Sequence, residues 1–228
     1  MMENWKQFLQ PYEQAVSELK LKLRQLRDQY QQTRKHSPIE FVTGRVKPVT
    51  SIIEKMQRRQ ITVDRLTEDM EDIAGIRVMC QFVEDIYVVV DVLKNRFDMQ
   101  VIEERDYITN QKQSGYRSYH IVIKYPIQRL SGKHEIKVEI QIRTLAMNFW
   151  ATIEHSLNYK YKGSFPRELE ERLRRSAEAA FLLDKEMSDI REEIKEAQAL
   201  FQTKQSNQIF DGEDEQDKRS TNENCNFR

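Results

Sequence analysis

Apolar residues recur at spacings of three and four along the first part of the chain, which is the period of an amphipathic helix. These positions are Trp5, Phe8, Tyr12, Val16, Leu19, Leu23, Leu26 and Tyr30. A second line on the same segment is basic, because Lys20, Arg24 and Arg27 follow the order i, i+4, i+7. We therefore predict one long N-terminal helix that carries an apolar stripe with a row of cations beside it.

Between residues 37 and 59 the pattern changes. Ser37-Pro38-Ile39-Glu40 has the order of a capping box with proline at the first helical position, and it predicts the start of a helix. Gly44 then breaks the chain. A further helix is predicted from Pro48 to Arg59, with its isoleucines facing inward.

The middle of the chain carries the signals of strands. They are expected at Ile76–Phe82, Met99–Ile108, Ser118–Tyr125 and Glu135–Arg143, with a helix from Glu84 to about Arg96. The last two strands form a hairpin across Ser131-Gly132. In the final strand Ile and Val alternate with Glu, Lys, Gln and Arg, so one of its sides is polar. These elements predict an α/β (α+β) fold, in which a mixed, largely antiparallel sheet is flanked by helices.

The C-terminal part is helical in pattern until its composition changes. Helices are predicted from Leu145 to about Tyr161 and from Glu168 to about Gln202, and from Thr203 onward we predict a disordered polar tail. Apolar stripes on both terminal helices are too long for one small domain to cover, so a homo-oligomer is expected. The predicted division is an N-terminal oligomerisation and regulatory helix (1–35), a catalytic domain (36–163), a C-terminal oligomer helix (164–202) and the tail (203–228).

Composition narrows the class of protein. The 228 residues include 37 basic and 37 acidic side chains, so the net charge is zero and any phosphate site must be a local patch. The longest apolar run, Ile86–Val90, is too short to span a bilayer, and the N-terminus lacks the apolar segment of a signal peptide. Cys80 and Cys225 make neither a disulfide framework nor a zinc set. We expect a cytoplasmic protein with no membrane partner.

Polar groups occupy strand positions in three stretches. These are Glu71–Arg77, Ser114–His120 and Val138–Thr144. For each strand taken alone, a polar side that faces water is as good an explanation as a ligand site. Their occurrence together favours a site.

A basic segment, Gly44–Gln60, carries five cations against one acid. Cations before and along the first turn of a helix suit a polyphosphate, although a solvated basic helix face has the same pattern. Asp72 and Glu139 are the two carboxylates that can be placed on strands beside these cations. Because carboxylate and phosphate oxygens suit Mg²⁺, the pattern is compatible with a magnesium–nucleotide site.

Other nucleotide and hydrolase signatures are missing from the sequence. It contains neither G-x-x-x-x-G-K-[ST] nor G-x-G-x-x-G, and it lacks the His-Asp dipeptide of metal-dependent phosphohydrolases. His36, His134 and His155 are expected to be structural or solvated.

The motifs together resemble those of the small alarmone synthetases, single-domain relatives of the Rel/Spo enzymes that make ppGpp and pppGpp. The matching strings are FVTGRVKPVTSI (41–52), EDIAGIRVMCQF (71–82), ERDYITNQKQSGYRSYH (104–120) and VEIQIRTLAMNFWATIEHSLNYKY (138–161). The resemblance implies a five-stranded, nucleotidyltransferase-like sheet and a synthetase without hydrolase activity. The implied reaction transfers the β,γ-pyrophosphoryl group of ATP to the 3′-hydroxyl of GTP or GDP and releases AMP.

The resemblance also implies roles for individual residues. Asp72 and Glu139 match the Mg²⁺ carboxylates, and Glu139 also matches the group that accepts the proton of the 3′-hydroxyl. Positions that match the ATP site are Arg45 and Arg77, around adenine, and Lys47, Ser51, Lys55 and Arg59, around the phosphates. Positions that match the acceptor site are Tyr116, as the platform for guanine, and Arg105, Lys112, His120, Gln141 and Asn148.

A tetramer is implied for these enzymes, and in one subgroup pppGpp binds a central cleft and activates synthesis. Positions that resemble this cleft are Lys20, Arg24, Arg27, Glu40, Phe41, Thr43 and Asn148. Because three of them form the basic line of the first helix, the chain is predicted to belong to the pppGpp-activated subgroup.

Two other functions stay open at the level of sequence. An RNA-binding module could hold single-stranded RNA along the basic region between Lys20 and Arg59, although the zero net charge weighs against it. A related transferase could modify tRNA or another nucleotide acceptor, and a panel of acceptors would separate that activity from alarmone synthesis.

Overall fold

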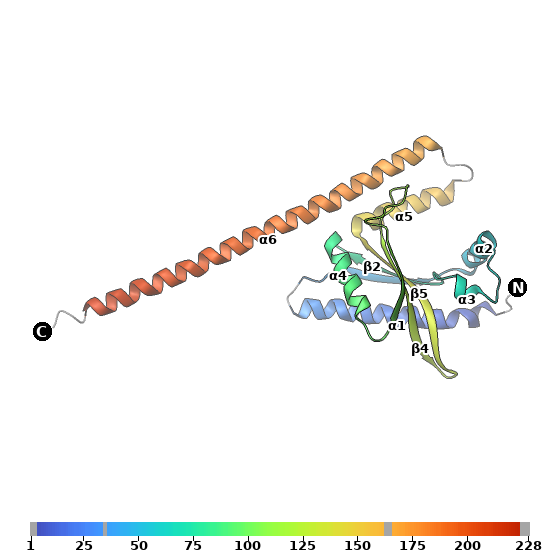
Figure 1. Ribbon diagram of the computed structural model, residues 1–228, viewed down its shortest axis with the longest axis horizontal. Helices are drawn as coiled ribbons and strands as arrows, with labels where there is room; N and C mark the ends of the chain where they lie inside the picture. Colours follow the sequence, from blue (N-terminus) through green and yellow to red (C-terminus); the bar gives the residue numbers. More distant parts are fainter. Residues whose placement is uncertain (1–3, 34–35, 162–165, 224–228) are drawn as a thin grey trace. The chain divides into compact units, whose positions relative to one another are not determined.

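The computed structural model describes residues 4–33, 36–161 and 166–223, and it describes side chains up to Phe201 except for 158–160 (Figure 1). The elements in order are α1 (Trp5–Gln32), β1 (Phe41–Val46), α2 (Val49–Arg59), α3 (Leu66–Asp69), β2 (Ala74–Cys80), α4 (Val83–Lys94), β3 (Gln100–Asp106), β4 (Tyr119–Arg129), β5 (Gly132–Thr144), α5 (Leu145–Lys160) and α6 (Arg167–Glu223). The chain divides into two compact units, Met1–Lys185 and Glu186–Arg228. The sheet and all predicted site residues belong to the first unit.

The strands form one mixed five-stranded sheet in the order β1-β2-β5-β4-β3. β2 and β5 are parallel, and the other neighbouring strands are antiparallel. β4 and β5 form the predicted hairpin, with Leu130 and Ser131 in its turn and Gly132 at a φ of 107°. Glycine adopts this conformation without the steric cost that a Cβ would bring. The fold class predicted from the sequence is confirmed.

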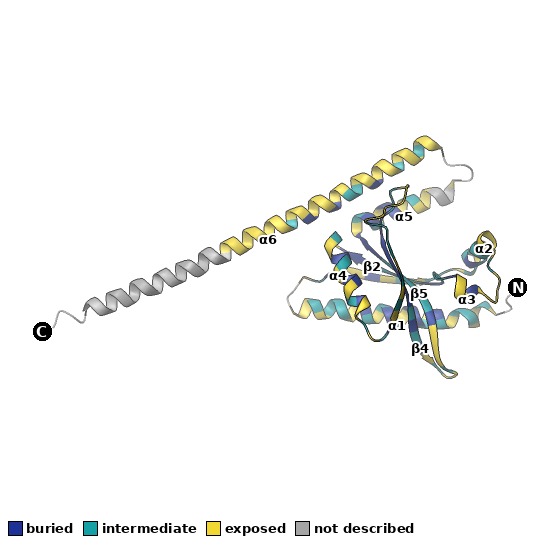
Figure 2. Cartoon of the chain, in the orientation of Figure 1, coloured by how far each residue is buried: buried dark blue, intermediate teal, exposed yellow. Residues whose placement is uncertain are grey.

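One face of the sheet is apolar and carries the main core. The isoleucine and valine positions of β5 are buried, as their alternation predicts. α1 and α4 cover this face, through Leu19 and Leu23 of α1 and Ile86 and Leu93 of α4 (Figure 2). Because burial of such a side chain stabilises the fold by about 1.5–3 kcal/mol, both helices are held firmly on the sheet. The opposite face, which we call the polar face, carries the candidate site.

The apolar stripe of α1 is directed at its own sheet. Val16, Leu19 and Leu23 are buried in the main core. Gly44 of β1 permits this close packing, since a Cβ at that position would lie 2.8 Å from Val16 Cγ1 and 2.9 Å from Lys20 Cδ. The expectation that this stripe needs a second subunit to cover it is therefore wrong for α1.

A strand occupies residues 41–46, where none was predicted. β1 pairs antiparallel with β2, with Phe41 opposite Met79. The capping-box pattern before it starts no helix, because the Ser37 hydroxyl accepts a hydrogen bond from the Ile39 N–H in the chain that leads into β1. The partner strand lies far along the chain, so a local pattern does not reveal this pairing.

The remaining helices of the first unit lie close to their predicted bounds, except for α3. This helix has four residues, and a single turn has too few positions to show a period. No helix in the described parts of the chain is both long and apolar enough to cross a membrane.

α6 continues to Glu223, beyond the end predicted near Gln202. Helix therefore replaces the disordered tail over 203–223, while 224–228 lie outside the described residues. This stretch contains no proline, and its Gln, Glu and Lys residues have good helix propensity. Polar composition alone was therefore a poor signal for the end of this helix.

Candidate active site

The polar face brings residues from all five strands into two rows across the sheet. The first row crosses β1, β2, β5, β4 and β3 through Thr43, Arg77, Gln141, His120 and Arg105. The second crosses the same strands through Arg45, Gly75, Glu139, Val122 and Glu103. Paired positions in a sheet share a face. The predicted ATP and acceptor residues, far apart in sequence, are therefore neighbours here.

Asp72 lies two residues before β2 and is paired with two lysines. Lys47 Nζ lies 2.7 Å from one carboxylate oxygen, and Lys55 Nζ lies 2.7 Å from the other. Burial disfavours the charged carboxylate, but its hydrogen bonds to the two ammonium groups outweigh that effect and lower the pKa of Asp72. The ionised carboxylate thus fixes both predicted phosphate ligands at one edge of the site.

Glu139 is the central carboxylate of the polar face. Its Oε1 lies 3.1 Å from His120 Nδ1, and its Oε2 accepts a hydrogen bond of 2.8 Å from Gln141 Nε2. Burial opposes ionisation, but the hydrogen bonds from His120 and Gln141 outweigh it, so the pKa of Glu139 is lowered. Glu139 is therefore an ionised group that can accept a proton or bind a cation.

Two chains of hydrogen bonds connect Arg143 with Glu139, one through Tyr116 and His120 and the other through Gln141. Its Nη2 donates to the Tyr116 hydroxyl at 2.5 Å and to Gln141 Oε1 at 2.9 Å. The Tyr116 hydroxyl in turn lies 2.8 Å from His120 Nε2. Because an ionised carboxylate only accepts, His120 Nδ1 donates to Glu139, while the Tyr116 oxygen accepts from Arg143. The contact between Tyr116 and His120 Nε2 joins these groups into one hydrogen-bonded chain.

Arg45 and Arg77 line a cavity of about 100 Å³ together with Asp72 and Glu139. The pKa of Arg77 is lowered, first by burial and then by the charges of Arg143 and Arg45. Cations that disfavour one another in this way are stabilised by a polyanion. The planar guanidinium groups can also stack on the face of a nucleobase.

Tyr116 is half-buried in the loop between β3 and β4, among other aromatic rings. The Tyr107 ring lies 6.1 Å from the Tyr116 ring and 5.2 Å from the His120 ring, in edge-on arrangements. Lys112 Nζ lies 4.4 Å above Tyr107 and 4.9 Å above Tyr116. Burial raises the pKa of Tyr116, although Arg143 opposes the shift, so the hydroxyl stays protonated. Aromatic faces with a cation above them form a suitable platform for a base.

Arg105 is paired with two acids. Its Nη2 lies 2.7 Å from Glu71 Oε2, and its Nε lies 2.5 Å from Glu103 Oε1. These two contacts use two of the five N–H donors of Arg105, so the others stay available to an anion.

The other predicted ligands, Ser51, Arg59 and Asn148, lie on two helices, α2 and α5. Ser51 lies in the first turn of α2, and Arg59 is the exposed last residue of that helix. Asn148 lies on α5, and its buried Oδ1 has no hydrogen-bond partner among the described residues. Since buried polar atoms are usually satisfied, this oxygen is available to a donor group on a ligand.

The residues predicted for product regulation gather mostly where α1 meets β1. Arg27 Nη1 donates to the backbone oxygen of Glu40 at 3.4 Å, and Lys20 packs beside Gly44. The exposed members of the set are Arg24, Glu40, Phe41 and Thr43. Asn148 belongs to a different element, α5.

The donor set suits Mg²⁺ in combination with a nucleotide. Asp72 and Glu139 line the same cavity, and the charge of Asp72 acts on the ionisation of Glu139. Among the described residues, no group of three or more His, Cys, Asp or Glu side chains forms a metal cage. Because Mg²⁺ commonly takes one or two protein carboxylates and completes its shell with phosphate and water, two carboxylates suffice.

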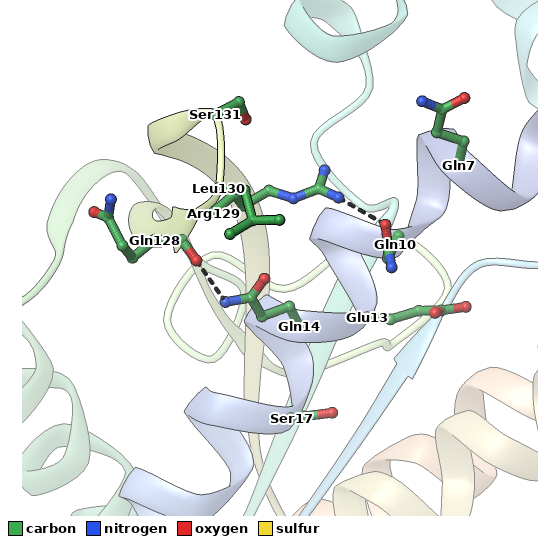
Figure 3. Close-up of a pocket in the computed structure, with 9 residues that line it drawn as sticks. All are labelled: Gln7, Gln10, Glu13, Gln14, Ser17, Gln128, Arg129, Leu130 and Ser131. Atoms are coloured by element: carbon green, nitrogen blue, oxygen red, sulfur yellow. Dashed lines mark hydrogen bonds between the residues drawn. The ribbon is translucent and has the colours of Figure 1, made fainter.

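A larger cavity, of about 940 Å³, lies between the N-terminal half of α1 and the β4–β5 hairpin (Figure 3). Gln14 Nε2 donates across it to the backbone oxygen of Gln128 at 3.2 Å, and Arg129 Nη2 donates to Gln10 Oε1 at 2.6 Å. None of the predicted site residues lines it. Size alone therefore does not identify the functional cavity.

Arg143, Tyr107 and Glu71 also contact the site residues, although no individual role was predicted for them from the sequence. Arg143 was recoverable, because it follows Gln141 by two positions on the alternating polar side of β5. The roles of Tyr107 and Glu71 depend on how a loop and a distant strand approach, which spacing does not reveal.

Comparison with known proteins gives a consistent set of matches. The family described as "Region found in RelA / SpoT proteins" matches residues 44–164. GTP pyrophosphokinase YjbM of Bacillus subtilis (strain 168) is 58% identical over 202 residues, which is 89% of this chain and 95% of that protein.

Solved structures agree with this. A GTP pyrophosphokinase family protein from Streptococcus pneumoniae has a TM-score of 0.82 at 62% identity and covers 88% of this chain and 98% of that one. The small alarmone synthetase 1 from Bacillus subtilis bound to its product pppGpp has a TM-score of 0.80 at 58% identity, covering 83% of this chain and 97% of that one. Its structure bound to AMPCPP has a TM-score of 0.75 at 54% identity, covering 84% and 98%.

Proposed function

The chain belongs to the RelA/SpoT family and is a GTP pyrophosphokinase that makes the alarmones ppGpp and pppGpp, and from this premise we propose how its polar face carries out the reaction. The β,γ-pyrophosphoryl group of ATP passes to the 3′-hydroxyl of GDP or GTP, and AMP leaves. The bond between the β-phosphorus and the α–β bridging oxygen breaks as the 3′-oxygen bonds to that phosphorus. The observation that carries the proposal is the cavity shared by Asp72, Glu139, Arg45 and Arg77.

The donor ATP lies on the β1–β2 side of the cavity. Arg45 and Arg77 stack on adenine, and their mutual repulsion is relieved as the phosphates arrive. Lys47 and Lys55 hold the phosphates beside Asp72, with Ser51 and Arg59 along α2. The pairing of both lysines with Asp72 supports this arrangement, because it keeps two cations extended toward the cavity before ATP binds.

The acceptor nucleotide lies on the β4–β3 side. Guanine stacks on Tyr116, Asn148 Oδ1 accepts a donor group of the nucleotide, and Lys112, Arg105, His120 and Gln141 complete the surroundings. The aromatic surroundings of Tyr116 and the unsatisfied Asn148 oxygen support this assignment. In this arrangement β5, which carries Glu139, lies between the strands of the donor and those of the acceptor.

Asp72 and Glu139 are the residues that would hold Mg²⁺. When bound, the ion neutralises the phosphate charge that opposes attack by a hydroxyl. Glu139 accepts the proton of the 3′-hydroxyl as that oxygen attacks. The two hydrogen-bond chains from Arg143 hold the Glu139 carboxylate in one orientation. Positioning of this kind contributes much of the rate enhancement in phosphoryl-type transfer.

The test replaces Glu139 by Gln, which keeps the size of the side chain and removes the base. We expect AMP formation from ATP and GTP to fall about 10²–10⁴-fold, the usual contribution of a general base. Glu135→Gln is a matched control, because Glu135 lies on the same side of β5 but is exposed. Near-normal turnover of the Glu139 variant at saturating Mg²⁺ would refute the assignment.

We also propose that the chain forms a homotetramer through α5 and α6. In the first unit these helices expose large apolar side chains: Phe149, Ile153, Leu157, Leu182 and Leu183. Contiguous apolar surface of this kind usually marks an interface. Sedimentation should give four chains per particle at micromolar concentration, and the mass of a single chain would exclude the interface.

Regulation by pppGpp is proposed at the basic surface where α1 meets β1. Added pppGpp should stimulate synthesis, and the double variant Lys20→Ala, Arg24→Ala should lose that stimulation. Lys6→Ala, which removes an exposed cation on the same helix, is the control. Single-stranded RNA is tested as a competitor in the same assay. A wild-type rate that pppGpp does not change would place the chain outside the activated subgroup.

A further inference from the structure

The loop between β3 and β4 (107–118), which we call the acceptor loop, packs against α6 at several points within the first unit. Gly115 has a φ of 84°, and a Cβ on it would lie 2.6 Å from the Cβ of Ala177. Tyr116 packs against a small cluster formed by Trp150, Ala151 and Ala177. The residue proposed to carry guanine therefore rests on α5 and α6 as well as on its own loop.

Arg117, the residue after Tyr116, extends this contact along α6. Its guanidinium carbon lies 3.7 Å from the centre of the Phe181 ring, and the side chain is 8% exposed. Its Nη2 donates to Gln111 Oε1 at 2.8 Å and to Glu178 Oε2 at 3.2 Å. A buried guanidinium that stacks on a ring of α6 and also bonds to Gln111 links the middle of the loop and its C-terminal end to that helix.

The same face of α6 is anchored to α5. Trp150 Nε1 donates to the backbone oxygen of Leu173 at 3.1 Å and to Ser176 Oγ at 2.9 Å. Further along, Thr144, the N-cap of α5, donates to Asp184 Oδ2 at 2.6 Å. The contact residues on α6 recur at helical spacing, so one continuous face of this helix meets the loop and α5.

We propose that this face of α6 is the outer wall of the acceptor site, with Arg117 and Phe181 as positioning residues that hold the loop in the arrangement that binds guanine. The proposal rests on the proposed function, since it takes Tyr116 as the guanine platform. It gives α6 a role in the chemistry of the same protomer, besides any role in assembly. Weakening the contact between α6 and the loop at 107–118 should reduce the fraction of molecules whose loop can bind GTP. Binding of ATP should not change.

The test uses Phe181→Leu, which keeps apolar bulk but removes the aromatic face, and Arg117→Lys, which keeps the charge but not the planar fork. Arg172→Lys, at an exposed position of the same helix, is the matched control. Initial rates of AMP formation are measured with GTP varied at saturating ATP, and then with ATP varied at saturating GTP. Hydrogen exchange of the backbone amides at 107–118 is measured on the same proteins without nucleotide.

We expect each of the two variants to raise the KM for GTP about tenfold, as when the competent loop is populated about a tenth of the time. The KM for ATP and the kcat at saturating GTP should stay within about twofold, because bound guanine restores the same loop arrangement. Exchange at 107–118 should accelerate in both variants and stay unchanged in Arg172→Lys.

Unchanged exchange at 107–118, or equal increases in both KM values, would overturn the proposal. Faster exchange with an unchanged KM for GTP would overturn it too, since the loop would then be held by α6 without governing the acceptor. Failure of the proposed function itself looks different, because the wild-type protein would then form no AMP that depends on a guanine nucleotide.

Discussion

Replacing Asp184 with Asn is expected to stabilise the protein at pH 8 and to leave its stability nearly unchanged at pH 4. Asp184 is buried on α6 and accepts a hydrogen bond from the Thr144 hydroxyl. Burial raises the pKa of Asp184 from 3.8 to about 6, although the Thr144 hydroxyl and the charge of Arg117 oppose the shift. Asn keeps an oxygen that accepts from Thr144 but carries no charge.

Because the pKa of Asp184 is higher in the folded state, the free energy of unfolding falls as the pH rises. Below pH 3.8 the carboxyl is neutral in both states, so its ionisation does not reduce the free energy of unfolding. Between pH 3.8 and about 6 the carboxyl ionises in the unfolded chain before it does in the folded protein, so stability falls, and above about 6 the loss is complete. A shift from 3.8 to about 6 corresponds to about 3 kcal/mol at pH 8. For a chain of this length that free energy equals about 6–12 °C in Tm.

The measurement is thermal unfolding of the wild type and the variant by calorimetry, from pH 4 to pH 8. Asp91→Asn, at an exposed position of α4, is the control and should shift Tm by less than about 1 °C at every pH, as surface changes do. If Asp184→Asn lowers the Tm equally at pH 4 and pH 8, the ionisation of this carboxyl does not limit stability and the reasoning is wrong.

Other substitutions test the site and the packing around it. Tyr116→Ala should raise the KM for GTP by roughly 5–150-fold and leave that for ATP unchanged, since stacking on one aromatic is worth about 1–3 kcal/mol; equal losses for both substrates, with a lower Tm, would instead indicate a structural residue. Lys55→Ala should raise the KM for ATP by about tenfold or more, as loss of a charge-assisted hydrogen bond does, and a normal KM would exclude Lys55 as a phosphate ligand. Gly44→Ala should cost about 1–3 kcal/mol in urea unfolding, because the added methyl would meet Val16, Ile76 and Lys20 at under 3 Å; an unchanged midpoint would show that α1 shifts freely.

The alternation along β5 was sufficient to predict which of its side chains enter the core and which face the site. Each position of a strand has a fixed face, so Glu139 and Gln141 needed no tertiary information. Pro48 directly before α2 is likewise a local signal, and that helix starts as expected.

Features that depend on distant pairing were not predictable in this way. β1 is an edge strand that contains Thr43, Gly44 and Arg45, and only β2 makes it a strand. The hydrogen bonds that start at Arg143 join residues of a loop and two strands. The stacking of Arg117 on Phe181 also joins residues far apart in sequence. Such contacts depend on the packed fold, because no period in the chain encodes which side chains will meet.

The turn of the β4–β5 hairpin has a consequence for how insertions and deletions act on this protein. Gly132, at the start of β5, lies seven residues before Glu139, or roughly 24 Å along an extended strand. A deletion or insertion of one residue inside β5 between them would turn Glu139 toward the core and Ile140 toward the nucleotides, because side chains alternate. A change of two residues would restore the faces but would move every site residue of β5 along its neighbours. Length variation is therefore best tolerated in the turn itself, at Leu130 and Ser131, and an indel scan of the hairpin should show activity lost within β5 far from any residue that touches substrate.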